Sequence, residues 1–69
     1  MTKYAIKLTK DDISTILAIF ESRDSALNAG AEYRKQYTRE QGLISCISAV
    51  FDESNNIVGN SYRLLESWR

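Results

Sequence analysis

Cys46 has the greatest intrinsic nucleophilicity of any residue in this sequence, and it is the only cysteine. A cysteine nucleophile is activated by a nearby base or cation, most often a histidine, and the sequence contains no histidine. Cys46 lies within an apolar stretch, where a thiol behaves as a small hydrophobic side chain. A Ser–His–Asp triad also needs a histidine, so no nucleophile–base pair can be named. We therefore predict no catalytic residue and no enzymatic activity.

Paired carboxylates occur at two places, Asp11 with Asp12 and Asp52 with Glu53, and in principle they could serve acid–base chemistry or bind a cation. Both pairs lie in predicted turns, where Asp side chains commonly accept hydrogen bonds from the backbone. Neither pair is accompanied by the further oxygen ligands of a calcium loop. One cysteine without histidine cannot form a Cys/His zinc site, and the three glycines are too far apart for a phosphate loop. We predict neither a metal nor a cofactor.

Arg34, Lys35 and Arg39 are candidate phosphate contacts, because they alternate with two tyrosines, and basic residues beside aromatic ones are typical of nucleic-acid-binding surfaces. On a helix, however, the tyrosines face one side while Lys35 and Arg39 face the other. Nine Lys and Arg against nine Asp and Glu also give a net charge of zero, which does not favour a general polyanion binder. A solvated helix face is the favoured interpretation, and nucleic-acid binding is the alternative.

The first half of the chain predicts two strands. Tyr4, Ile6 and Leu8 alternate with polar or small residues, which is typical of a half-buried strand. After a polar turn at residues 9–12, residues 13–20 also fit helical spacing, but their many β-branched side chains favour a second strand. The longest apolar run, residues 16–20, is far shorter than the roughly 20 residues that span a bilayer.

A helix is predicted to begin after Ser22 or Asp24, either of which can accept a hydrogen bond from a free N–H group of the first turn. Small residues on the inner face, Gly30 among them, indicate that the helix approaches its neighbours closely. Gly42 is predicted to end the helix in a left-handed conformation. The inner face comprises Ala26, Ala29, Gly30, Tyr33 and Tyr37.

Residues 43–51 and 57–68 are predicted to form a second hairpin. Asn tolerates positive φ, so Asn55 and Asn56 are predicted to occupy the centre of a type I′ turn. With this turn, all the paired apolar side chains point to one face of the sheet. The predicted pairs are Ala49 with Tyr62, Ile47 with Leu64, and Leu43 with Trp68.

These elements predict an α+β fold: a single small domain over residues 1–69, in the order ββαββ, with a four-stranded, mainly antiparallel sheet and one helix on one face. The second and third strands are apolar on both sides, whereas one helix covers only one face. The other face is therefore predicted to be a protein interface, and a second copy of the chain is its simplest cover. The predicted interface residues are Ile16, Ala18, Phe20, Ile44, Cys46 and Val50.

The favoured function is that of a small non-enzymatic protein-binding module, which acts as a homodimer through its helix-free sheet face. Such a module could serve as an adaptor, an inhibitor-like partner or an accessory protein of a mobile element. The alternative is a small nucleic-acid-binding regulator that uses the basic helix face. The absence of a possible intramolecular disulfide and of a long apolar segment predicts a cytoplasmic protein with no membrane partner.

Overall fold

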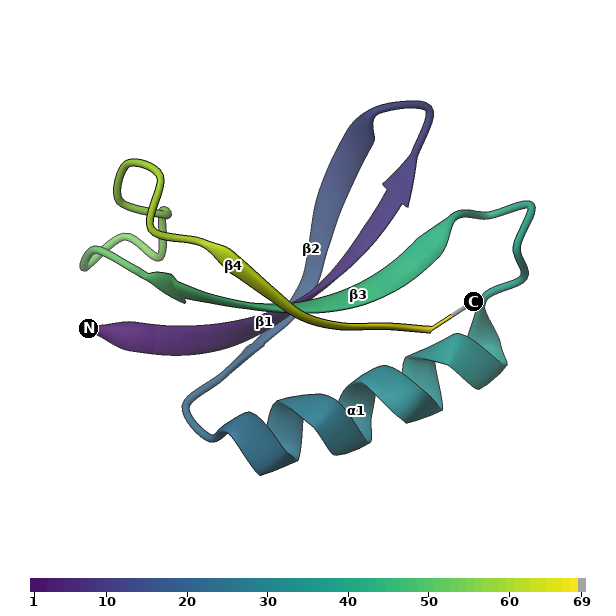
Figure 1. Cartoon of the computed structure of the whole chain (residues 1–69), viewed down its shortest axis with the longest axis horizontal. Coiled ribbons are helices and arrows are strands. Elements are labelled where there is room, and N and C mark those ends of the chain that lie inside the picture. The colour runs from purple at the N-terminus through teal and green to yellow at the C-terminus, as the bar shows by residue number, and fades with distance from the viewer. Residues whose placement is uncertain (69) are drawn as a thin grey trace.

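The elements of secondary structure follow one another in the order strand, strand, helix, strand, strand. The structure is a computed structural model that describes residues 1–68. Within this range, four strands form one antiparallel sheet in the order β2-β1-β3-β4, and a helix lies across one of its faces (Figure 1). The predicted α+β fold and the ββαββ order are confirmed. The elements are β1 (Thr2–Lys10), β2 (Ile13–Phe20), α1 (Arg23–Gln36), β3 (Leu43–Val50) and β4 (Arg63–Trp68).

The hairpin of β1 and β2 turns over two residues, Asp11 and Asp12, which have φ angles of 52° and 65°. Positive φ at both central residues is the mark of a type I′ turn, which matches the twist of the flanking strands. The predicted strand at residues 13–20 is confirmed. A bulge shifts the pairing between Ile6 and Lys7, so that Leu17 is an extra residue in β2. The bulge breaks the alternation of side chains along this strand.

Ser22 caps the N-terminus of α1, as predicted, and its hydroxyl accepts a hydrogen bond from the Ser25 N–H at 3.4 Å. Ala26 and Gly30 are the buried residues of the helix and lie on its predicted inner face. A methyl group at position 30 would overlap the Trp68 ring, so glycine lets the helix lie directly against the last strand. This explains a residue that costs about 1 kcal/mol in a helix.

The prediction that Gly42 ends the helix is wrong. The helix ends at Gln36, because Tyr37 turns to an extended conformation and its N–H donates to the Tyr33 carbonyl. Gly42 does have a positive φ of 138°, but it lies six residues further on, immediately before β3. There a side chain would collide with the Thr9 carbonyl, so glycine permits the close contact between the end of the loop and β1.

The connection between β3 and β4 differs from the predicted two-residue turn. Only Asn55 has a positive φ, and the Asp52 carboxylate accepts hydrogen bonds from the Ser54 and Asn56 N–H groups, both at 2.9 Å. A single bridge joins Phe51 to Ile57, and β4 begins only at Arg63. Asp52 therefore acts as a turn residue, as predicted, while the type I′ turn at Asn55 and Asn56 is a wrong prediction.

The register of β3 and β4 is confirmed at its centre and wrong at its end. Ile47 pairs with Leu64, as predicted, but Trp68 pairs with Ile44 rather than with Leu43. A bulge between these two pairs adds one residue to β4. The ladder stops at Arg63, so the predicted pair of Ala49 with Tyr62 lies beyond it.

The sheet separates two groups of buried apolar side chains. The face that α1 covers, here called the helix face, buries Ile6, Ile44 and Cys46 against Ala26 of the helix. The opposite side, here called the open face, buries Ala5, Ile47, Ala49 and Phe51, with Ile19 and Ile57 packed beside them. The helix does not reach the open face, and the segment that follows β3 covers part of it through Phe51 and Ile57.

Candidate interaction surfaces

The predicted interface residues do not gather on the open face. Phe20, Ile44 and Cys46 pack on the helix face beneath α1. Ala18 pairs with Ile6, and Val50 continues the alternation from Cys46, so both also belong to the helix side of the sheet. Only Ile16 lies on the open face, beside Ile47. The assignment of these six residues to a helix-free face is therefore wrong for all but Ile16.

The error has two physical causes. First, β3 is apolar on both sides, so alternation alone does not say which side faces the helix; the pairing of Ile6 with Cys46 decides it. Second, the bulges in β2 and β4 each invert the faces partway along a strand. As a result, Leu64 projects from the open face while Trp68 packs against the helix.

Cys46 is a core residue. Its side chain is fully buried among the residues of the helix face. Burial raises the pKa of the Cys46 thiol above its ordinary value of 9.0, and the positive charge of Arg23 offsets this only in part. A thiol that stays protonated at neutral pH is a poor nucleophile, so its chemical role here is to fill space.

Exposed apolar side chains gather on the open face. Ile16, Tyr62 and Leu64 retain 41%, 53% and 62% of their accessible surface. The Lys7 ammonium lies 5.7 Å from the centre of the Tyr62 ring, a distance typical of a cation–π contact. Ile16 and Tyr62 line one cavity with the buried Ile47, and Leu64 pairs with Ile47 in the sheet, so apolar side chains extend from the core to solvent.

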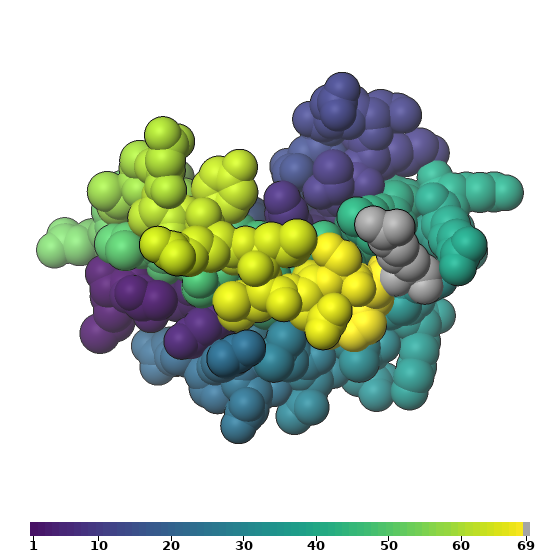
Figure 2. Space-filling view, in the orientation of Figure 1, coloured from purple at the N-terminus to yellow at the C-terminus, as the bar shows by residue number. Residues whose placement is uncertain are grey.

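The open face is concave. The hairpin of β1 and β2 and the segment before β4 project on either side of it, and Figure 2 shows the depression between these two projections. A cavity of about 310 Å³ lies there, and Lys7 is the one charged residue in its lining. The cavity is lined by Lys7, Ser14, Ile16, Ile47, Ile57 and Tyr62.

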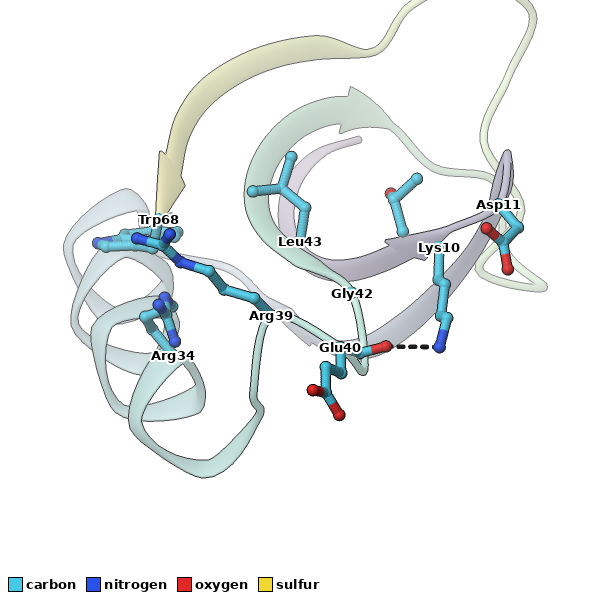
Figure 3. A pocket seen from close by; sticks show the side chains of 9 residues that line it. Lys10, Asp11, Arg34, Arg39, Glu40, Gly42, Leu43 and Trp68 are labelled. Carbon is cyan, nitrogen blue, oxygen red and sulfur yellow. Dashed lines mark hydrogen bonds between the residues drawn. The ribbon is translucent and has the colours of Figure 1, made fainter.

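The candidate phosphate contacts separate into two places. Lys35 is exposed on the outer side of α1 and forms an ion pair with Glu32 at 3.4 Å, as the spacing of three residues predicts. Arg34 and Arg39 instead line a cavity of about 440 Å³ at the end of the sheet, together with Lys10 and other residues. Figure 3 shows the Arg39 side chain extending toward Trp68, and Arg34 lines the same cavity from α1.

Lys10 and Trp68, which lie beside these arginines, were not predicted from the sequence. Both residues reach the cavity through strand pairing over long separations: Thr9 pairs with Leu43, and Ile44 pairs with Trp68. The bulge between β3 and β4 determines the pairing of Ile44 with Trp68, and no local sequence pattern predicts this bulge. The pairing of Thr9 with Leu43 could have been predicted, since antiparallel pairing of β1 with β3 brings the end of β1 to the start of β3.

Comparisons with known proteins find no match, whether among protein-family models, curated proteins or solved structures. In residues 1–68, no three or more Cys, Asp and Glu side chains lie close enough together to hold a metal ion. Within the same residues, α1 falls short of the length and apolar character that a membrane-crossing helix requires.

Proposed function

We propose that this protein is a non-enzymatic protein-binding module that acts as a homodimer through the open face of its sheet. The observation that carries the proposal is a group of three exposed apolar side chains beside the buried Ile47. Ile16 and Tyr62 line one cavity with Ile47, and Leu64 pairs with Ile47 in the sheet. Contiguous apolar surface of this kind is typical of interaction sites. It lies on the face that the single helix does not cover.

Charge complementarity favours a second copy of the chain as the occupant. The cavity on the open face carries the positive charge of Lys7. The tip of the neighbouring hairpin carries Asp11 and Asp12, both exposed, followed by Ile13 with 70% of its surface accessible. In a dimer with twofold symmetry, each copy inserts the acidic and apolar tip of its β1–β2 hairpin into the cavity of the other copy. The symmetry makes the two insertions equivalent, so both form together.

The small size of the described fold supports the same choice. A core built by fewer than about 70–80 residues rarely contributes more than 3–5 kcal/mol to stability, so a small domain gains from association. Its role would be that of an adaptor, an inhibitor-like partner or an accessory protein. The compartment we propose is the cytoplasm, because the single, buried Cys46 suits a reducing environment.

Sedimentation equilibrium at tens of micromolar protein tests the proposal. The wild type should sediment as a dimer, and Leu64→Glu as a monomer, because the charge would be desolvated against the partner copy. Val50→Glu is the matched control: Val50 is also an exposed apolar strand residue, but it lies on the helix side of the sheet. A wild type that is monomeric, or a Val50→Glu variant as disruptive as Leu64→Glu, would contradict the proposal.

A second comparison tests which part of the partner fills the cavity. Asn tolerates positive φ as Asp does, so Asp11→Asn with Asp12→Asn removes both charges while preserving the turn. The doubly substituted protein should dimerise several-fold more weakly than the wild type, and the difference should shrink as salt is added. An unchanged dissociation constant at low salt would contradict insertion of the hairpin tip.

A further inference from the structure

A second cavity, independent of the open face, lies at the end of the sheet where β1, β3, β4 and the C-terminal end of α1 meet (Figure 3). Its volume is about 440 Å³, within the range of small-molecule sites. Three cationic side chains, Lys10, Arg34 and Arg39, reach it from a strand, the helix and the loop after the helix. Trp68 provides its aromatic wall.

Among the described residues, the cations of this cavity form no ion pair with the carboxylates beside them. Asp11 and Glu40 also line the cavity, but the one ion pair within residues 1–68 is that of Lys35 with Glu32, on the outer side of the helix. Lys10 donates instead to the Glu40 backbone carbonyl. Arg34 donates to the Tyr37 carbonyl at 3.2 Å, which leaves other guanidinium N–H groups to bind a ligand.

The lining favours a ligand with two parts. Guanidinium groups bind phosphate oxygens through paired N–H donors, so the arginines suit a phosphate group. Among residues 1–68, three cations against two carboxylates in the lining leave only a small excess of positive charge, which would hold a phosphate alone weakly. Trp68 is half-buried, with its ring against Gly30 of α1, and it lines the cavity as well; an indole in this position offers a flat apolar surface for a planar ring.

We infer that this cavity binds a phosphate-bearing planar heterocycle, that is, a nucleotide, with its phosphate at Arg34 and Arg39 and its base along Trp68. The nucleotide can be free or can be the terminal residue of a single-stranded nucleic acid, since both offer the same phosphate and ring. The site shares Asp11 with the hairpin tip of the homodimer proposed above. The inference places no part of the ligand on Asp11, however, and so does not rest on that homodimer.

Trp68 is the only tryptophan in the sequence, so its fluorescence reports directly on the cavity. In a titration with adenosine 5′-monophosphate, the emission should change and saturate. Adenosine and inorganic phosphate, each supplying one half of the ligand, should bind at least about tenfold more weakly. No saturable change up to millimolar nucleotide, or equal binding of adenosine and the nucleotide, would overturn the inference.

Two variants with the same change of charge locate the site. Arg39→Glu should weaken nucleotide binding by about tenfold or more, whereas Lys35→Glu, outside the cavity, should leave it within about twofold of the wild type. Thermal unfolding of each variant confirms that it is folded. Equal losses in the two variants would overturn the placement of the phosphate, because they would indicate a general effect of charge.

A further titration distinguishes a free nucleotide from the terminal nucleotide of a single-stranded nucleic acid. A short 5′-phosphorylated single-stranded RNA that binds at least about tenfold more tightly than the mononucleotide would assign the site to nucleic-acid ends, and equal affinity would assign it to free nucleotides. Repeating the titration with Leu64→Glu separates this inference from the proposed dimer. Nucleotide binding should be the same in this variant as in the wild type, whatever its association state.

Discussion

Both faces of the sheet carry apolar side chains, but these side chains are buried from solvent to very different extents on the two faces. On the helix face, Ile6, Ile44 and Cys46 are fully buried beneath α1. On the open face, the segment after β3 buries Ile47, while Leu64 beside it keeps 62% of its surface accessible. Within residues 1–68, the one helix thus completes one core layer and leaves the other partly exposed. The helix face holds the fold together, and we propose that the open face holds two copies together.

The largest difference between the two faces should appear when the same charge is placed on each. Ile44→Glu buries a carboxylate in the helix-face core and removes an apolar side chain, which should cost roughly 4 kcal/mol or more and leave the protein largely unfolded. Leu64→Glu should cost less than about 1 kcal/mol in the dilute monomer. Circular dichroism at micromolar concentration checks both variants. Comparable losses of stability would break the distinction between the faces.

The role of the chain end in closing the helix face can be tested at Trp68. Its ring covers Gly30 and joins β4 to α1. Trp68→Ala should destabilise the protein by about 3 kcal/mol, the lower end of the range for such substitutions, because the ring is only partly buried. Urea unfolding, followed by circular dichroism since the fluorophore is lost, measures the cost. A loss below about 1 kcal/mol would show that the helix face does not depend on its last strand.

A smaller effect is expected from the ionisation of Cys46. Since burial raises the pKa of this thiol in the folded state, the folded protein holds its proton more tightly than the unfolded chain does. The resulting stabilisation is complete below the ordinary pKa of 9.0 and is lost as the pH rises through the higher pKa of the folded state. Unfolding free energies should therefore fall more steeply above pH 9 in the wild type than in Cys46→Ala. Equal slopes would contradict a desolvated thiol.

Elements with a strong local signal could be predicted from the sequence. The alternation in β1, the β-branched residues of β2 and the Ser22 cap of α1 all depend on neighbouring residues, and all are confirmed. The turn types were harder to predict, because Asp and Asn both tolerate positive φ. The type I′ turn lies at Asp11 and Asp12, whereas Asn55 belongs to a longer turn that the Asp52 carboxylate organises.

The faces of the strands could not be predicted, because they depend on bulges. The extra residue at Leu17 moves Ile16 to the open face, and the bulge in β4 separates Leu64 from Trp68. In strands that are apolar on both sides, a shift by one residue leaves the pattern of polar and apolar residues almost unchanged. The sequence therefore predicted an uncovered apolar face but assigned the wrong residues to it. It missed Trp68 as a neighbour of the arginines for the same reason, since the bulge in β4 sets the pairing of Trp68 with Ile44.

The dependence of stability on protein concentration is the most direct test of a dimer formed through the open face. If the open face joins two copies, the urea midpoint of the wild type should be higher at the higher of two protein concentrations about 100-fold apart. The apparent free energy of unfolding should increase by up to about 2.7 kcal/mol. The midpoint of Leu64→Glu should be the same at both concentrations. A wild-type midpoint that does not change with concentration would contradict dimerisation through the open face, because that face would then be stable without a second copy.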